Sequence, residues 1–274
     1  MLYLLILFAV LALIVCLAGT QVLPPRGHSS GAAFFSGRPF AHRGLHQKGL
    51  IPENSLAAFQ RACEHHYGIE LDVRMSKDGH LCILHDRSLN RMAGHDLKID
   101  SLDLKAIQAY HLEGTAEHVP SLAEALKVVD GRVPLIIEMK SNGLHDDPAR
   151  IPRSLQKAMA DYPGPWCVES FDARMLRVCR RLGYTVPLGQ LSARQPLFPF
   201  AKWLQGMLVC NLISRPDFIA YEKGASPPGW RFYRRHSVPL IAWTVRSKDE
   251  WNRIRDVYSN YIFEGFDPDE ENDH

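Results

Sequence analysis

The sequence lacks several features that would each have indicated a function. It has no dense run of lysine and arginine, and its formal net charge is only +2, which excludes the basic surface of a typical nucleic-acid-binding protein. Its six cysteines include no CxxC pair, so neither a zinc site nor a disulfide framework is indicated. It has no GxGxxG turn, which argues against a dinucleotide-binding sheet. Nothing in it implies a protein partner.

The first 23 residues contain no charged side chain. An apolar run of roughly 18 or more residues is long enough to cross a bilayer. A cleavable secretory signal would place lysine or arginine ahead of the run, and here neither precedes it. We therefore predict one retained transmembrane helix over residues 1–23. The basic residues Arg26 and Arg38 follow it, which predicts a cytosolic position for the rest of the chain.

The remainder of the chain is predicted to form a linker and one domain. Residues 24–36 are rich in proline, glycine and serine, as linkers are. Residues 37–274 contain no second linker, no low-complexity tract and no internal repeat. With 46% hydrophobic residues over the whole sequence, this part can bury a full-sized core.

Short β-type runs alternate with helical stretches along this domain. The eight runs are "PFAHRG", "GIELDV", "PLIIEMK", "WCVESF", "VPLGQLS", "GMLVCNL", "PLIAWTV" and "NYIFEGF". Most gaps between them are long enough for a helix, as in "NSLAAFQRACEHH" and "KDEWNRIRDVY". Strands that alternate with helices predict a parallel sheet, and eight units over about 240 residues favour a (β/α)8 barrel, the TIM barrel. An open, doubly wound sheet is the alternative.

Polar side chains follow the carboxyl ends of these runs. In a barrel all of those ends open onto one mouth, where catalytic residues lie. The residues are His42, Arg43, Glu70, Asp72, Glu138, Lys140, Glu169, Gln190, Asn211, Trp243 and Glu264. Any one of them is explained equally well as a capping or solvated residue at the rim. Acids, histidines and cations that arrive together from several strands instead predict an active site.

The segment "ELDVRMSKDGHLCILHD" predicts a β-hairpin above this mouth. Glu70 and Asp72 are two residues apart in a strand, so their side chains point to one face. "SKDG" is too short for a crossover and suits a tight turn with Asp78 and Gly79 at its centre. In that register Asp72 lies opposite His85, with Cα atoms about 4.5 to 5.5 Å apart. A shift of one residue would turn His85 to the other face.

Three carboxylates are thus expected in one place, from Glu70, Asp72 and Glu138. Such an oxygen-rich group suits one hard divalent cation, Mg²⁺ or Ca²⁺.

Two histidines and two cations are predicted around this cation. His42 and His85 are expected to act as general base and general acid, because imidazole exchanges protons near neutral pH. Arg43 and Lys140 supply positive charge for an anionic group such as phosphate. Together with a metal ion, these groups predict phosphoryl transfer to a hydroxyl or to water.

Seven short motifs occur in order between residue 38 and about residue 268. They are "AHRG", "PENS", "ELDVRMSKDG", "LHD", "VPSLAEAL", "IEMK" and "AWTV". No single motif is specific, but the ordered set resembles the glycerophosphodiester phosphodiesterases.

This resemblance implies a (β/α)8 barrel and the divalent-metal-dependent hydrolysis of a small-molecule glycerophosphodiester to sn-glycerol 3-phosphate and an alcohol. The matching positions are His42 and His85 for the catalytic histidines, Glu70, Asp72 and Glu138 for the metal ligands, Arg43 and Lys140 for the phosphate contacts, Glu53 for the acid of the "PEN" motif near the metal, and Trp243 for an aromatic wall of the substrate pocket.

Two departures from the family's motifs concern the last two strands. The common Thr-Asp near the last strand appears as "FEGFDP", so the role of that Asp is either lost or taken by Glu264 or Asp267. "WTVR" replaces the frequent "WTVN" and leaves Arg246 without an assigned role. Neither departure removes a metal or catalytic position, and activity is therefore expected.

Two alternatives to this function remain open. The anchor, together with an apolar segment, "RQPLFPFAKWLQ", would suit membrane lysophospholipids as substrates and make the protein a lysophospholipase D-like enzyme. A membrane-tethered binding module without catalytic activity is the other alternative, against which the complete set of predicted catalytic and metal-binding residues argues.

Overall fold

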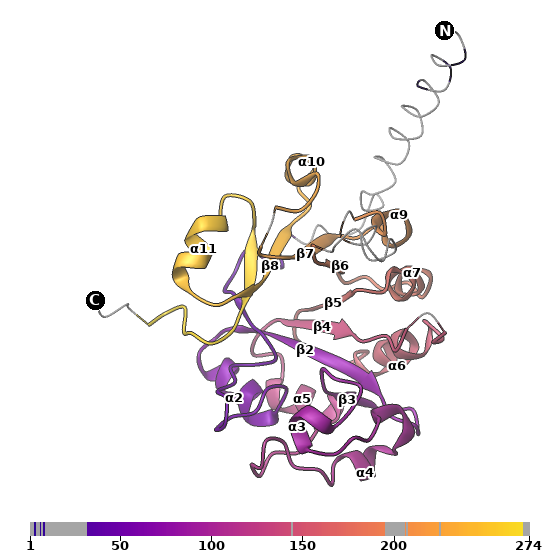
Figure 1. The fold of residues 1–274 in the computed structure, drawn as a ribbon, viewed down its shortest axis with the longest axis vertical. Coiled ribbons are helices and arrows are strands. Elements are labelled where there is room, and N and C mark those ends of the chain that lie inside the picture. Colours follow the sequence, from indigo (N-terminus) through magenta and orange to yellow (C-terminus); the bar gives the residue numbers. More distant parts are fainter. Residues whose placement is uncertain are drawn as a thin grey trace.

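The computed structural model is a closed barrel of parallel strands (Figure 1). The residues that it describes are 3, 6, 8, 32–143, 145–194, 206, 208–224 and 226–270. Within these ranges the parallel strands are β1 (Phe40–Ala41), β2 (Gly68–Met75), β4 (Leu135–Met139), β5 (Trp166–Ser170), β6 (Leu188–Ser192), β7 (Phe218–Glu222), β8 (Leu240–Val245) and β9 (Asn260–Phe263). Each pairs in parallel with the next, and β9 pairs with β1, which closes the ring. The predicted eight-stranded parallel barrel is confirmed.

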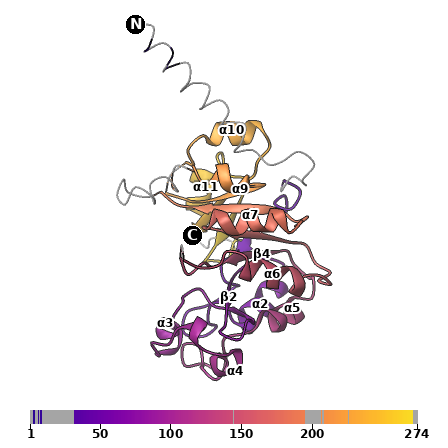
Figure 2. The same ribbon diagram turned by 90° about the vertical axis from the view of Figure 1, so that its right-hand side faces the viewer.

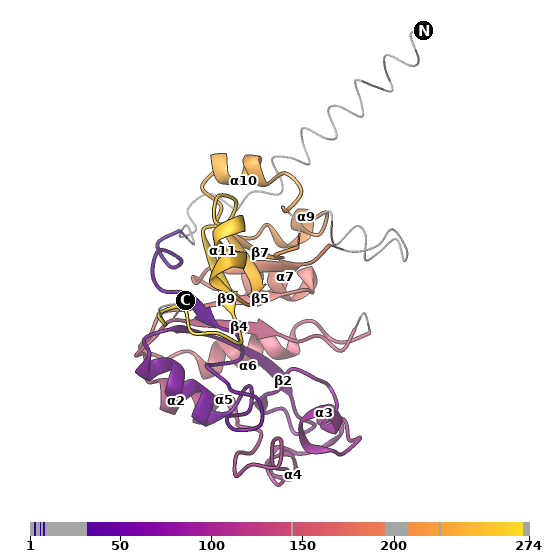
Figure 3. The same ribbon diagram turned by 60° about the vertical axis from the view of Figure 1, so that its left-hand side comes forward.

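Helices cover the outside of this barrel. They are α2 (Leu56–Glu64), α5 (Leu122–Val129), α6 (Arg150–Ala158), α7 (Ala173–Arg181), α9 (Asn211–Ser214), α10 (Trp230–Arg235) and α11 (Lys248–Ile254). Helices α6, α7 and α9 follow one another along one side, whereas α10 and α11 lie against the β8 side (Figures 1 and 3). Three helices begin with a serine whose hydroxyl accepts the backbone N–H three residues further on, namely Ser55, Ser121 and Ser247.

The part of the chain between β2 and α5 forms a lobe beside the barrel (Figure 2). It contains β3 (Leu81–Ile83), α3 (Asn90–Ala93), a 3₁₀ turn (Ile99–Ser101) and α4 (Leu104–Ile107). Its buried apolar side chains, such as Leu89, Met92 and Ile107, form a small core of their own. The lobe therefore has its own packing to hold the hairpin beside the barrel mouth.

The interior of the barrel is apolar beneath the predicted site. Phe40 and Phe218 pack there with Ile136 and Cys167 in one buried cluster. Glu138 follows Ile136 by two residues, and Glu169 follows Cys167 by two. Side chains two residues apart in a strand point to the same face, so both glutamates also point into the barrel, nearer to its mouth. A Cβ at Gly189 would lie 2.1 Å from the Phe218 ring, so only glycine leaves room for this ring.

One predicted strand is wrong. The run "GMLVCNL", residues 206–212, is not a strand, because residues 208–210 form a turn and Asn211 begins α9. The corresponding barrel strand is β7, "FIAYE", which the sequence analysis missed. A short apolar run fits a buried turn or helix as well as a strand. The Asn211 amide is buried and donates to Tyr233 Oη at 3.1 Å, outside the barrel rather than at its mouth.

The predicted hairpin is present, but its register differs by one residue. The observed pairs are Val73–Ile83, Arg74–Cys82 and Met75–Leu81. Asp72 O therefore accepts from Leu84 N, and His85 is not the residue opposite Asp72. Gly79 has a φ of +84°, whereas Asp78 does not have a positive φ. The turn is one residue longer than predicted, which is the next most common way to close a hairpin.

The predicted anchor lies outside the described residues, apart from Tyr3, Ile6 and Phe8. Most of the predicted linker also lies outside the described residues. Of the apolar segment at 194–205, only Arg194 is described. Among the residues with a described structure, no helix has both the length and the apolar character needed to cross a membrane.

Candidate active site

Three buried carboxylates meet above the apolar layer of the barrel. Glu70 comes from β2, Glu138 from β4 and Glu169 from β5, and their ligand oxygens lie within 4.8 Å of one another. Strand register fixes this grouping, because Glu138 lies level with Glu169. Burial raises the pKa of Glu70 and of Glu169 well above the usual carboxyl range, and the neighbouring carboxylates raise both further.

Asp72 lies beside this cluster and is held by positive and amide groups. It lies level with Glu138 in the sheet. Lys140 Nζ lies 2.9 Å from Asp72 Oδ1, and Arg43 Nε lies 3.2 Å from Asp72 Oδ2. Asn54 Nδ2 donates to Asp72 Oδ2 at 2.8 Å. Burial alone would raise the pKa of Asp72, but Lys140 and Arg43 outweigh it and hold that pKa far below its usual range.

These four carboxyl groups fit a hard divalent cation. Oxygen ligands from carboxylates are what Mg²⁺ and Ca²⁺ prefer. Glu169 is only 1% exposed, and its Oε2 has no hydrogen-bond partner among the described residues. Asp72 Oδ1, in contrast, is paired with Lys140 Nζ at 2.9 Å. Buried polar atoms are rarely left without a partner, so Glu169 Oε2 has the character of a ligand atom.

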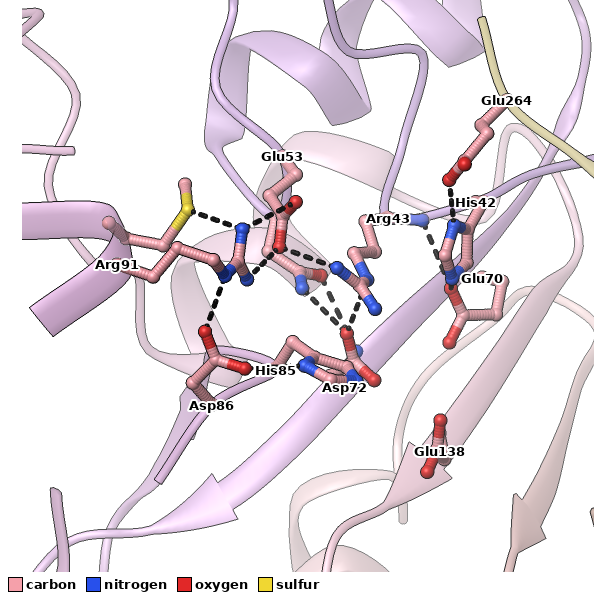
Figure 4. A network of polar contacts seen from close by, with 12 residues as sticks. His42, Arg43, Glu53, Glu70, Asp72, His85, Asp86, Arg91, Glu138 and Glu264 are labelled. Atoms are coloured by element: carbon pink, nitrogen blue, oxygen red, sulfur yellow. Dashed lines mark hydrogen bonds and ion pairs between the residues drawn. The ribbon is translucent and has the colours of Figure 1, made fainter. Parts of the chain in front are cut away.

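His42 follows β1 directly and lies between two carboxylates (Figure 4). Its Nδ1 lies 2.6 Å from Glu264 Oε2, and its Nε2 lies 3.9 Å from Glu70 Oε2. The backbone N–H of Arg43 donates to Glu70 Oε2 at 3.0 Å, which fixes the same carboxylate. The Nε2 atom of His42 therefore faces the carboxylate cluster.

His85 follows the hairpin, and its ring nitrogen Nδ1 lies 2.7 Å from Asp86 Oδ1 (Figure 4). Its carbonyl accepts from Arg74 Nε at 2.9 Å and from Arg74 Nη2 at 2.6 Å. Because β3 ends at Ile83, the alternation of side chains along the strand does not decide where the His85 side chain points. The His85 ring lies close enough to Asp72 for the negative charge of that carboxylate to raise the pKa of His85. Burial outweighs this and lowers the pKa of His85 overall.

A chain of ion pairs links the two sides of the site through Glu53. Arg43 Nη1 donates to Glu53 Oε1 at 2.7 Å, and Arg91 donates to the same carboxylate at 2.6 and 3.0 Å. Arg91 Nε lies 2.5 Å from Asp86 Oδ2. Arg91 therefore connects Glu53, which holds the predicted phosphate-binding arginine, to the carboxylate that holds His85.

The structure thus brings together eight of the nine residues singled out for the site, all except Trp243. Trp243 on β8 packs edge-on against Phe171, with ring centroids 5.8 Å apart, next to the apolar cluster inside the barrel. Sequence reasoning placed Glu169 at a strand end but gave it no role, and its position two residues after a core residue was the available signal. It gave no role to Asn54, although this residue belongs to the quoted "PENS" motif, and it missed Arg91, for which the sequence carried no signal.

The fold and this geometry define a class of protein: a TIM-barrel enzyme with two carboxylate-supported histidines beside a cation-binding carboxylate cluster. A family model described as the glycerophosphoryl diester phosphodiesterase family matches residues 42–263. The chain belongs to this family and is a phosphoric diester hydrolase.

Named relatives agree with this assignment, and a solved structure agrees with the fold. The Mycobacterium tuberculosis protein named "Probable glycerophosphodiester phosphodiesterase 2" is 38% identical over 79% of this chain and 83% of its own length. A glycerophosphodiester phosphodiesterase of Caldanaerobacter subterraneus is 28% identical over 78% of this chain and 88% of its own. An Oleispira antarctica phosphodiesterase, solved with the product sn-glycerol-3-phosphate, has a TM-score of 0.69 at 21% identity, covering 85% of this chain and 94% of that one. At that identity the likeness supports the fold alone.

Proposed function

We propose that the protein hydrolyses glycerophosphodiesters to sn-glycerol 3-phosphate and an alcohol, in a reaction that requires one divalent cation, Mg²⁺ or Ca²⁺. One observation carries the proposal: two histidines, each with Nδ1 on a carboxylate, stand beside a buried carboxylate cluster at the barrel mouth. The names of the relatives support the same substrate class.

The proposed ligands of the cation are Glu70, Asp72 and Glu138, and Glu169 adds a fourth carboxylate. Four carboxylates, together with the positive charges of Arg43 and Lys140, leave two negative charges, which a divalent cation neutralises. When bound, such a cation polarises a phosphoryl oxygen and stabilises the negative charge that develops on it.

Arg43 and Lys140 are proposed to bind the phosphate group of the substrate. Lys140 Nζ lies 2.7 Å from Glu138 Oε2, and the Lys140 side chain is only 10% exposed. Burial lowers the pKa of Lys140, but Asp72 and Glu138 outweigh it and raise that pKa, so the ammonium stays charged. Glu53 fixes the Arg43 guanidinium from behind, and we assign it this supporting role near the substrate.

His42 and His85 are proposed as the acid–base pair. One imidazole takes the proton of the attacking hydroxyl, which belongs to water or to the substrate's own glycerol, and the other protonates the leaving alcohol. Each Nδ1 is held by a carboxylate, which leaves each Nε2 to exchange the proton. Trp243, beside Phe171, is proposed to wall the pocket for the substrate.

The test is a substrate comparison with the full chain in detergent, stripped of metal and resupplied with Mg²⁺ or Ca²⁺. We expect release of glycerol 3-phosphate from glycerophosphocholine and glycerophosphoethanolamine, and little reaction with lysophosphatidylcholine. Turnover of lysophosphatidylcholine alone would instead establish the lysophospholipase D-like enzyme. No metal-dependent turnover of any of the three would refute the proposal and favour the binding module.

We also propose, from the sequence, that residues 1–23 anchor the protein in a membrane, that 24–36 form a linker, and that the catalytic domain (37–274) lies in the cytosol. The uncharged run and the basic Arg26 and Arg38 after it support this. Retention in the membrane fraction after an alkaline carbonate wash, with the domain cleaved by protease only in opened cells, is the expected result. Recovery in the soluble fraction would contradict it.

A further inference from the structure

Three neighbouring strands of the barrel each end next to a charged residue. Strands β8, β9 and β1 are adjacent, and the residues that follow them are Arg246, Glu264 and His42. Backbone hydrogen bonds fix the positions of these three residues relative to one another along the barrel axis. His42 N donates to Phe263 O at 2.8 Å, and Glu264 N donates to Val245 O at 3.0 Å. The three side chains thus start from one level of the barrel rim.

An irregularity in β8 produces this alignment. Ala242 pairs with Tyr261, but the next pair is Val245 with Phe263, so β8 has one residue more than β9 between the two pairs. Without that extra residue, Val245 would lie level with Glu264 and the arginine would lie beyond it. The bulge therefore brings Arg246 level with Glu264.

The three side chains form one chain of contacts. Arg246 Nη2 lies 2.5 Å from Glu264 Oε1, and the other oxygen of that carboxylate lies 2.6 Å from His42 Nδ1. Asp267, the other acid of "FEGFDP", is occupied elsewhere, because it accepts from Tyr67 Oη and pairs with His65 Nδ1. Hydrogen bonding to His42 lowers the pKa of Glu264 to about 2, against the effect of burial, and Arg246 adds to this.

The same arrangement occurs on the other histidine. Asp86 uses one oxygen for His85 Nδ1 and the other for Arg91 Nε. The site therefore holds two histidine–carboxylate–arginine groups, one from the strand ends and one from the lobe. The difference lies in the arginines, since Arg91 is also fixed by Glu53, whereas the side chain of Arg246 is 59% exposed.

We propose that Glu264 is a positioning residue for His42, that it holds the proton on Nδ1 so that the lone pair of Nε2 faces the substrate, and that Arg246 in turn orients Glu264. A carboxylate that accepts from Nδ1 fixes both the tautomer and the ring orientation. This assignment rests on the proposed function for its effect on turnover, but the tautomer itself does not depend on turnover. It also gives one shared role to Glu264 and Arg246, the two residues that depart from the family's motifs.

The first test is steady-state kinetics on glycerophosphocholine with saturating cation. Glu264→Gln is expected to lower kcat by about 10²-fold with little change in KM, because a mispositioned base loses rate rather than binding. Glu264→Asp should recover part of that loss. Arg246→Gln should cost less, about threefold to tenfold in kcat, because the Arg246 side chain is 59% exposed and its ion pair with Glu264 is screened by water. Glu270→Gln and Arg253→Gln, at exposed positions, are the matched controls.

The second test is ¹⁵N NMR of the imidazoles in the cation-loaded protein, with the His42 signal assigned by its loss in His42→Ala. The inference predicts a protonated Nδ1 in the wild type and a shift toward protonated Nε2 in Glu264→Ala. An unchanged tautomer, or a Glu264→Gln enzyme with full kcat, would overturn it. A wild type without turnover but with the predicted tautomer change would sink the proposed function and leave the positioning contact standing.

Discussion

The substitution Glu169→Gln tests the carboxylate cluster most sharply, because it is expected to act in opposite directions with and without cation. In the metal-free protein, the pKa of the Glu169 carboxyl is raised by burial and by Glu138. The folded state then binds a proton that the unfolded state releases, so this carboxyl makes folding less favourable as the pH rises. Glutamine has no proton to bind. The metal-free variant should therefore be at least as stable as the wild type at pH 8.

With cation present the variant should lose stability relative to the wild type. A ligand at 100 times its Kd stabilises a protein by about 2.7 kcal/mol. For a chain of this size that corresponds to a rise in Tm of about 5 to 11 °C. Loss of one carboxylate ligand should lower the affinity for the cation at least as much as loss of a residue that supports a ligand does, which is about tenfold to a hundredfold. At the same cation concentration the remaining gain is about 0.4 to 1.4 kcal/mol.

The assay is thermal unfolding of the full chain at pH 8, with and without Mg²⁺ or Ca²⁺, next to isothermal titration of the cation. Glu270→Gln, an exposed carboxylate, is the matched control and should keep the wild-type gain. A Glu169→Gln protein that keeps the full cation-dependent rise in Tm would refute the assignment of Glu169 to the cation site.

Three further predictions follow from the packing and the charges. Without cation, thermal stability should fall as the pH rises above the usual carboxyl range of about 4 to 5, because the raised pKa values of Glu70 and Glu169 mean that the folded state holds protons that the unfolded state releases. Saturating cation should reduce this dependence of Tm on pH, as measured by thermal unfolding at several pH values. Gly189→Ala should cost about 1 to 3 kcal/mol in urea unfolding, since its Cβ would meet the buried Phe218 ring; an unchanged midpoint would contradict that packing. Asp86→Ala should lower kcat by about tenfold to a hundredfold with KM little changed, because the His85 ring loses its Nδ1 partner; equal kcat would rule out this role.

The parts of the fold set by alternation along the chain were predictable from sequence. Polar residues at strand ends identified Glu70, Glu138 and His42, because the carboxyl ends of parallel strands share one mouth. Strand β7 was missed because "GMLVCNL" is the more apolar run, and apolar content alone does not separate a strand from a buried turn. What makes "FIAYE" the strand is its pairing with the neighbouring strands of the barrel, and this pairing is not visible in the sequence.

Features that depend on register between strands were beyond the sequence. The hairpin turn gained one residue because Asp78-Gly79 fits a longer loop as well as a two-residue one. The bulge in β8 leaves no local signal, so the contact of Arg246 with Glu264 was not foreseen. The lobe's Arg91 reaches the site only through the folding of α3, which no motif indicated.

The most direct measurement of the central claim is turnover of glycerophosphocholine by the metal-stripped full chain, before and after cation is restored. His42→Ala should be measured beside His111→Ala, an exposed histidine outside the site. The account predicts glycerol 3-phosphate release that appears only with cation, is lost in His42→Ala and persists in His111→Ala. Release without cation, or equal release by His42→Ala, would contradict it.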